Sequence, residues 1–119
     1  MLNIDRFGVQ PPEAYLYTSR SRCYNADGID DHVDFANTLK AMSTIGLSQN
    51  EVDNIFKILA AILWLGNVQF IENQEGNAAI ADSSVPTYVA YLLDVDAVSV
   101  DKVRLFSSIL TLGSNISYD

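Results

Sequence analysis

The feature that most restricts the fold of this chain is an unbroken run of eight apolar residues, Ile58 to Leu65. The run is far shorter than the roughly 20 residues needed to cross a bilayer, so we expect no transmembrane segment. From Val52 to Leu65, eleven of fourteen residues are apolar, which favours a helix. A helical turn that is apolar on every side must be covered on every side, so other elements have to pack around it.

Polar residues indicate where this helix begins and ends. Ser48 and Glu51 fit the capping box, in which each residue accepts a hydrogen bond from the backbone N–H of the other. Gly66 and Asn67 follow the last apolar residue and are typical of a helix end. We therefore predict a helix that starts after Ser48 and ends before Gly66.

A second helix is predicted at about residues 31–44. Either Asp30 or Asp31 fits the N-cap, because a short carboxylate side chain accepts hydrogen bonds from the first free N–H groups. Gly46 is placed to end the helix. Three apolar residues recur at helical spacing and predict the packed face: Phe35, Leu39 and Met42.

The remaining segments complete a mainly α fold with four main helices and a small β-hairpin. Asp27-Gly28 is a turn signal. The helix that follows Asp82-Ser83-Ser84 has an apolar face made of Val85, Tyr88, Val89, Leu92 and Leu93, with Pro86 in its first turn. The other predicted elements are a helical turn at 12–17, a hairpin of 68–71 with 78–81, and a last helix carrying Val100, Val103, Phe106 and Leu110.

Composition excludes several classes of function. The chain has 119 residues, enough for one domain or one piece of a larger one. Its net charge of −8 argues against nucleic acid and anionic membranes as partners. Cys23 is the only cysteine, which suits a reducing compartment. Because no basic region precedes an apolar stretch at the N-terminus, we expect no signal peptide and a cytoplasmic location.

The motifs that hold nucleotides or zinc do not occur in this sequence. A phosphate-binding loop needs Gly-Lys before Ser or Thr, and none of the three lysines follows a glycine. The dinucleotide fingerprint needs two glycines separated by one residue, and no pair of glycines is that close. One cysteine and one histidine cannot supply a typical zinc ligand set.

Weaker chemical candidates have simpler structural explanations. Cys23 and His32 could form a nucleophile–base pair, but no orienting partner or oxyanion donor can be named. Residues 23–34 imitate a calcium loop, although its first position is Cys23 and the shorter Asp34 replaces the final glutamate. Capping and turn formation explain this segment better.

Three further candidates are also better explained without chemistry. Asp94 and Asp96 fit a solvated link between helices better than a pair of acid–base carboxylates. Asn115 begins a glycosylation sequon that we interpret as a chance match. The apolar helix around Trp64 fits core packing better than a ligand site. We therefore assign no catalytic, cofactor-binding or metal-ligating residue.

Several segments, in order, resemble the myosin motor domain, and most closely its fungal class I branch. Residues 17–24, followed by 27–31 (DGIDD), resemble the family's tyrosine-rich segment and the turn after it. The closest stretch is 55–70, IFKILAAILWLGNVQF, which is similar to one of the most recognisable helix-and-strand runs in myosins. The resemblance covers about residues 11–100, and residues 102–119 diverge. Pro86 also departs from the family, which usually has an ordinary helix former there.

The resemblance implies that residues 1–119 are part of a myosin head, a member of the P-loop NTPase superfamily. In that family this region belongs to the upper half of the actin-binding cleft, between switch I and a surface loop that touches actin. The family hydrolyses MgATP, but its phosphate loop and both switches have no counterpart here. The resemblance therefore transfers no catalytic or ligand residue, and we expect that this chain alone neither holds MgATP nor hydrolyses it.

The leading hypothesis is a fragment of a class I myosin, an actin-based, ATP-driven motor of the cytoplasmic actin cytoskeleton. Its expected partners are actin filaments and the remainder of the motor domain. The alternative is a stand-alone acidic helical module that binds other proteins without catalysis. A third class, a cysteine-dependent enzyme, would rest on the pair Cys23 and His32.

Overall fold

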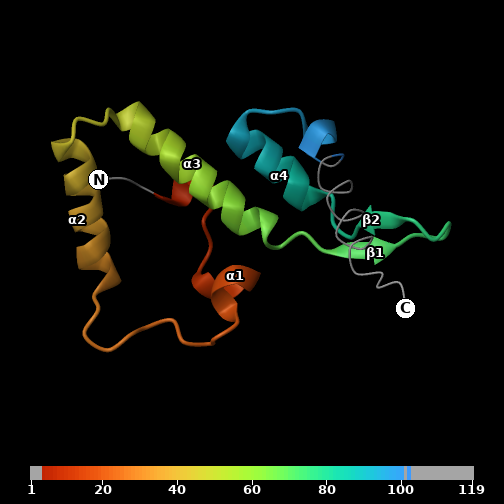
Figure 1. Cartoon of the computed structure of the whole chain (residues 1–119), viewed down its shortest axis with the longest axis horizontal. Coiled ribbons are helices and arrows are strands. Elements are labelled where there is room, and N and C mark those ends of the chain that lie inside the picture. The colour runs from red at the N-terminus through yellow and green to blue at the C-terminus, as the bar shows by residue number, and fades with distance from the viewer. Residues whose placement is uncertain (1–3, 101, 103–119) are drawn as a thin grey trace, which may run out of the picture. The chain divides into compact units, whose positions relative to one another are not determined.

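The computed structural model describes residues 4–100 and 102, and it is mainly helical with one antiparallel hairpin (Figure 1). The predicted fold class is therefore confirmed. The chain divides into two compact units, residues 1–60 and 61–119, with the boundary inside one helix. The elements in chain order are η1 (Ile4–Phe7), η2 (Pro12–Ala14), α1 (Leu16–Ser19), α2 (Asp31–Thr44), α3 (Gln49–Leu65), β1 (Phe70–Glu72), β2 (Ala78–Ile80) and α4 (Ser84–Leu93).

In the first unit, α2 has the predicted bounds and the predicted caps. Asp30 is the N-cap, and its carboxylate accepts hydrogen bonds from the backbone N–H groups of His32 and Val33. Gly46 adopts a φ of 91°, a left-handed conformation that costs glycine no steric strain and closes the helix end. The predicted face is half-buried, and Phe35 meets Phe56 of α3 edge to face, with 5.5 Å between the ring centroids.

The N-terminal segment of the same unit differs from the prediction. The expected turn at 12–17 is two short pieces, η2 and α1, separated by Tyr15 in an extended conformation (φ −116°, ψ 131°). The phenol oxygen of Tyr15 accepts a hydrogen bond from the Gln10 backbone N–H at 2.8 Å, and the residue is fully buried. A buried tyrosine that bonds back to the chain fixes the break between the two pieces.

The long helix α3 starts and ends where the sequence predicts. Its first backbone bond runs from the Val52 N–H to the Ser48 carbonyl, which identifies Ser48 as the N-cap. After Leu65 the chain turns through Gly66 and Asn67, whose N–H groups still bond to α3 carbonyls. No helix in the described ranges, 4–100 and 102, is long and apolar enough to cross a membrane.

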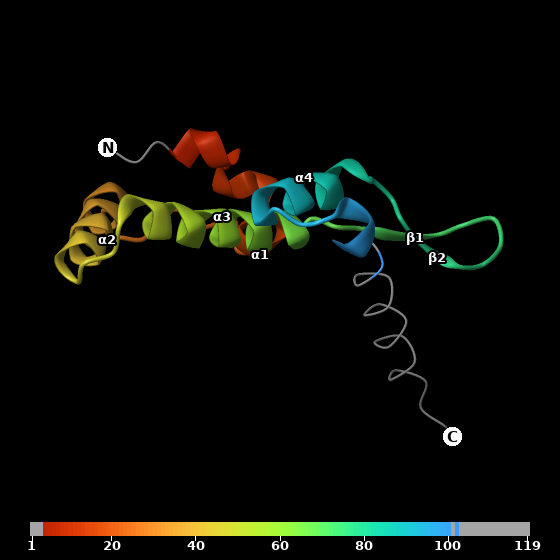
Figure 2. The same cartoon turned by 90° about the horizontal axis from the view of Figure 1, so that it is seen from above.

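The second unit contains the hairpin and α4. Strands β1 and β2 pair antiparallel with Ile71 opposite Ala79, and Figure 2 shows the hairpin from a second direction. Val89, Leu92 and Pro86 of α4 are buried, so Pro86 is tolerated in the first turn as predicted. Trp64, at the end of α3, meets Tyr88 edge to face at 5.5 Å.

The predicted last helix lies only partly within the described residues. Residues 97–100 and 102 are helical, and Asp96 accepts a hydrogen bond from the Ser99 N–H at 3.0 Å. The remaining predicted positions, Val103, Phe106 and Leu110, lie outside the described residues, as does the sequon at Asn115.

Candidate functional site

The apolar run on α3 remains partly uncovered and is the main candidate for an interaction surface. Ala60 and Ala61 are each 1% exposed, whereas Ile58, Leu59 and Ile62 are 51%, 48% and 48% exposed. Ile62 is four residues after Ile58 and three after Leu59, and residues at these spacings are neighbours on a helix surface. We call Ile58, Leu59 and Ile62 the apolar stripe. Within the described part of the chain, the run is therefore buried at Ala60 and Ala61 and about half exposed along the apolar stripe.

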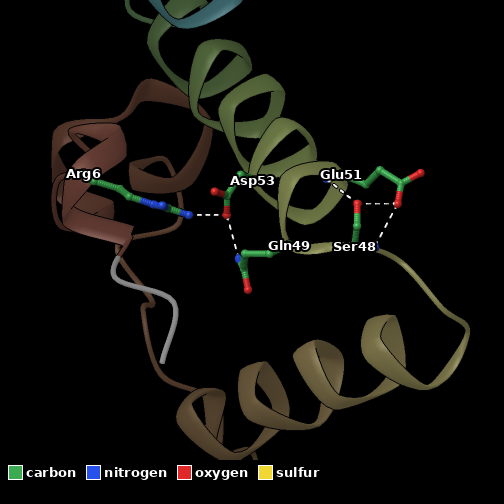
Figure 3. A network of polar contacts seen from close by, with 5 residues as sticks. All are labelled: Arg6, Ser48, Gln49, Glu51 and Asp53. Atoms are coloured by element: carbon green, nitrogen blue, oxygen red, sulfur yellow. Dashed lines mark hydrogen bonds and ion pairs between the residues drawn. The ribbon is translucent and has the colours of Figure 1, made fainter.

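A capping box holds the start of α3 (Figure 3). The Glu51 Oε2 accepts the Ser48 backbone N–H at 2.8 Å and the Ser48 hydroxyl at 2.7 Å. In return, the Ser48 Oγ accepts the Glu51 N–H at 3.4 Å. The two hydrogen bonds from Ser48, the hydroxyl first and the backbone second, lower the pKa of Glu51 because they favour the charged carboxylate.

An ion pair beside the capping box joins the N-terminal segment to α3. The Arg6 guanidinium pairs with the Asp53 carboxylate, which also accepts the Gln49 side-chain N–H at 2.7 Å (Figure 3). The same guanidinium lies 4.7 Å from the ring centroid of Phe7, a residue that is only 3% exposed. Since the Arg6 side chain is 45% exposed, the pair contributes at most about 1 kcal/mol. The pair connects the segment that carries the buried Phe7 to α3.

Cys23 and His32 each have a local structural role, and no hydrogen bond between them is found among the described residues. The Cys23 thiol donates to the Asn25 carbonyl at 3.3 Å, and its backbone N–H donates to the Ser21 hydroxyl. The His32 backbone N–H belongs to the cap made by Asp30. Both residues are exposed. The geometry therefore offers no nucleophile–base pair.

The segment that imitates a calcium loop is a turn followed by a helix cap. Gly28 has a φ of 79°, and the Ile29 N–H bonds to the Ala26 carbonyl at 3.1 Å, which closes a tight turn. The Asp30 carboxylate bonds to backbone N–H groups of α2. Within residues 4–100 and 102, no group of three or more His, Cys, Asp or Glu is arranged to hold a metal ion.

Asp94 and Asp96 also act on the backbone near them. Asp94 has a φ of 55° and a ψ of 45°, which is the left-handed conformation that ends a helix. The Val95 N–H then bonds to the Ala90 carbonyl at 3.0 Å, as in a Schellman motif. Asp96 receives the Ser99 N–H and hydroxyl. The region around Trp64, the last candidate, is an aromatic contact with Tyr88.

The starts of α2, α3 and α4 carry carboxylates of the chain itself. Phosphate groups bind at helix N-termini because free N–H groups point at them. Here a carboxylate of the chain itself lies at the start of each longer helix: Asp30 at α2, Glu51 at α3 and Asp82 at α4. Asp82 accepts the Ser84 N–H at 2.9 Å, and hydrogen bonding from Ser84 lowers the pKa of Asp82. Each of these helix starts therefore presents negative charge where a phosphate would have to approach.

The candidate polar residues thus form caps and turns, and the apolar stripe remains the main candidate for an interaction surface. A family model described as "Myosin head (motor domain)" matches residues 3–118. The chain is 60% identical over 98 residues to Myosin-1 of Mycosarcoma maydis and 64% identical over 96 residues to Myosin-1 of Yarrowia lipolytica. Myosin-1 of Aspergillus oryzae is 59% identical over 98 residues.

These matches cover most of this chain and little of the relatives. The three alignments include 81–82% of the chain but 8% of each relative. The chain thus spans less than a tenth of the length of the curated relatives it matches.

Proposed function

Because the chain belongs to the myosin head family, we propose that it acts as one piece of the motor head of a class I myosin. The whole motor hydrolyses MgATP and moves on actin filaments in the cytoplasmic actin cytoskeleton. This piece contributes to the upper half of the actin-binding cleft. Its immediate partner is the remainder of the motor domain.

The observation that carries this proposal is the 60% identity over 98 residues to a Myosin-1 of which the chain covers 8%. The apolar stripe supports it. Ile58, Leu59 and Ile62 are each about half exposed, although isoleucine and leucine are usually buried in a complete folded domain. A stripe of this kind fits an element that neighbouring segments of a larger protein cover.

The proposal also assigns nucleotide chemistry to the rest of the motor. The chain has no Gly-Lys loop, and the carboxylates of Asp30, Glu51 and Asp82 lie at the starts of the three longer helices. Bound to the whole motor, MgATP supplies the energy of hydrolysis. The residues of this chain would pack and position the cleft without touching the nucleotide.

A transplant tests the proposal. The matching segment of Mycosarcoma maydis Myosin-1 is replaced by this chain, and the purified motor is assayed for ATP hydrolysis with and without actin filaments. We expect hydrolysis to rise when actin is added, as in the parent motor. The control is the same transplant with residues 48–65 in scrambled order, which keeps the composition but destroys the helix pattern.

Two outcomes separate the fragment from the alternative. A folded, actin-activated transplant together with an inactive control supports the proposal. A transplant no more active than its scrambled control contradicts the proposal and favours the stand-alone acidic module.

A further inference from the structure

The β1–β2 hairpin has a backbone edge whose hydrogen-bonding groups can be assigned residue by residue. The Asn73 N–H bonds to the Asn77 carbonyl at 2.8 Å, and the Ala81 N–H bonds to the Gln69 carbonyl at 2.9 Å. Opposite residues in an antiparallel pair alternate between hydrogen-bonded and non-bonded. Ile71 and Ala79, midway between those two bonds, therefore form the next bonded pair.

It follows that Ala78 and Ile80 direct their N–H and C=O groups away from β1. The sheet has two strands, and no further strand pairs with β2 within residues 4–100 and 102. No hydrogen bond to either residue's outward groups is found in that part of the chain. Both residues are half-buried. Backbone polar groups that leave water need partners, so this edge is suited to receive another strand.

The composition of β2 is also that of an edge made to be paired. Exposed edge strands usually carry lysine, proline or another charge that blocks pairing. Ala78, Ala79 and Ile80 contain none of these, and the alanine side chains allow close approach. A two-stranded hairpin is at best marginally stable alone, and a third strand would stabilise it.

The charges around the hairpin indicate which kind of strand fits. Glu72, Glu75 and Asp82 flank β1 and β2, and residues 58–101 contain no lysine, arginine or histidine. A strand with basic side chains would meet carboxylates without meeting like charges. The hairpin of a second copy of this chain would bring the same three carboxylates, Glu72, Glu75 and Asp82, instead.

We propose that the outer edge of β2 accepts an extended strand with basic side chains, supplied by the part of the motor head that lies outside this chain. This inference rests on the proposed function, because the chain covers 8% of the relatives and most of the polypeptide is elsewhere. Backbone bonds to Ala78 and Ile80 hold the strand, and the carboxylates select its charge.

Amide hydrogen exchange, resolved by residue, tests the proposal in two samples: this chain alone and the transplanted Mycosarcoma maydis motor. The Ala78 and Ile80 N–H groups should exchange at least about tenfold more slowly in the transplant, because each gains a strand partner. Ala79 is the matched control, since its N–H already bonds within the hairpin in both samples.

The outcomes of this experiment test the added strand separately from the proposed function as a piece of the motor head. An actin-activated transplant in which Ala78 and Ile80 exchange as fast as in the isolated chain overturns the strand addition and leaves the function standing. Slower exchange at Ala78 without slower exchange at Ile80 also overturns it, because a strand would bond to both. A transplant that does not fold contradicts both proposals.

Discussion

Ser48 and Glu51 bond to each other's backbone N–H groups, with Glu51 as the stronger acceptor at 2.8 Å and Ser48 the weaker at 3.4 Å. Glu51 also accepts the Ser48 hydroxyl, so one carboxylate oxygen holds both donors of Ser48. The first turn of α3 is thus stabilised by side chains three residues apart. This local closure makes the helix start testable without disturbing the core.

Replacing Ser48 by alanine should lower the free energy of unfolding by about 1 kcal/mol, because the cap hydroxyl is lost. Urea denaturation followed by circular dichroism measures the change. Ser83→Ala is the matched control, since Ser83 precedes α4 but makes no side-chain cap hydrogen bond. Equal unfolding midpoints for Ser48→Ala and the parent chain would show that the capping box does not stabilise α3.

Acid should weaken the starts of α3 and α4. The pKa values of Glu51 and Asp82 lie below their usual values of 4.5 and 3.8, through hydrogen bonds from Ser48 and Ser84. A carboxylate whose folded pKa is lowered stabilises the fold above its unfolded pKa and loses that contribution as the pH falls through the folded pKa. Stability should therefore decline on acidification below about pH 4.5.

Carbon-detected NMR titration of the carboxylates checks this prediction directly. In the Ser48→Ala variant the Glu51 pKa should rise toward 4.5 while that of Asp82 stays unchanged. A Glu51 pKa that is the same in both proteins would contradict the assigned cause.

Asp94→Gly should stabilise the chain by roughly 0.5–1 kcal/mol. Asp94 adopts the left-handed conformation at the end of α4, where glycine has no side-chain strain, and its charge faces the negative end of the helix. Asp96→Gly is the control and should be slightly destabilising, because the bond from the Ser99 N–H is lost. Thermal unfolding of both variants gives the comparison. A lower midpoint for Asp94→Gly would mean that its side chain is needed where it lies.

The isolated chain should not bind MgATP. The helix starts at α2, α3 and α4 present carboxylates, and no Gly-Lys loop exists to surround the phosphates. Calorimetric titration with MgATP should show no saturable heat, with a phosphate-loop ATPase as the positive control. A micromolar, magnesium-dependent site would contradict this expectation.

The apolar stripe should make the isolated chain bind a hydrophobic dye and self-associate despite its charge of −8. The double variant Ile58→Gln and Ile62→Gln should bind clearly less dye, because two half-exposed apolar side chains are replaced. Ile45→Gln is the control, since Ile45 is exposed but lies outside the stripe. Sedimentation velocity measures the oligomeric state. A compact monomer without dye binding would instead support the independent module.

Local signals in the sequence predicted most of the fold. The bounds of α2 and the capping box of α3 follow from residues within one or two turns of the helix end, so spacing alone locates them. The Arg6–Asp53 pair could not be predicted, because it joins residues 47 positions apart and neither belongs to a repeating pattern. The break at Tyr15 depends on burial of one ring, which composition does not reveal.

The sequence indicated that the apolar run of α3 needs a partner, but it did not indicate which residues of the run are exposed. An all-apolar run requires cover, yet only the structure shows that Ala60 and Ala61 are buried while the apolar stripe is half exposed. The strand edge was missed for a different reason. The direction of the Ala78 and Ile80 amides depends on hairpin register, and the predicted strands, at 68–71 and 78–81, did not specify which residues pair.

Because Trp64 contacts Tyr88, the fluorescence of Trp64 can report on the structure of the second unit. Trp64 is the only tryptophan in the sequence, so its emission comes from a single place, the end of α3 where α4 packs. Separation of α4 from that end would expose the indole to water and shift its emission to longer wavelengths. The unmodified chain therefore carries its own fluorescent reporter of whether the two helices are in contact.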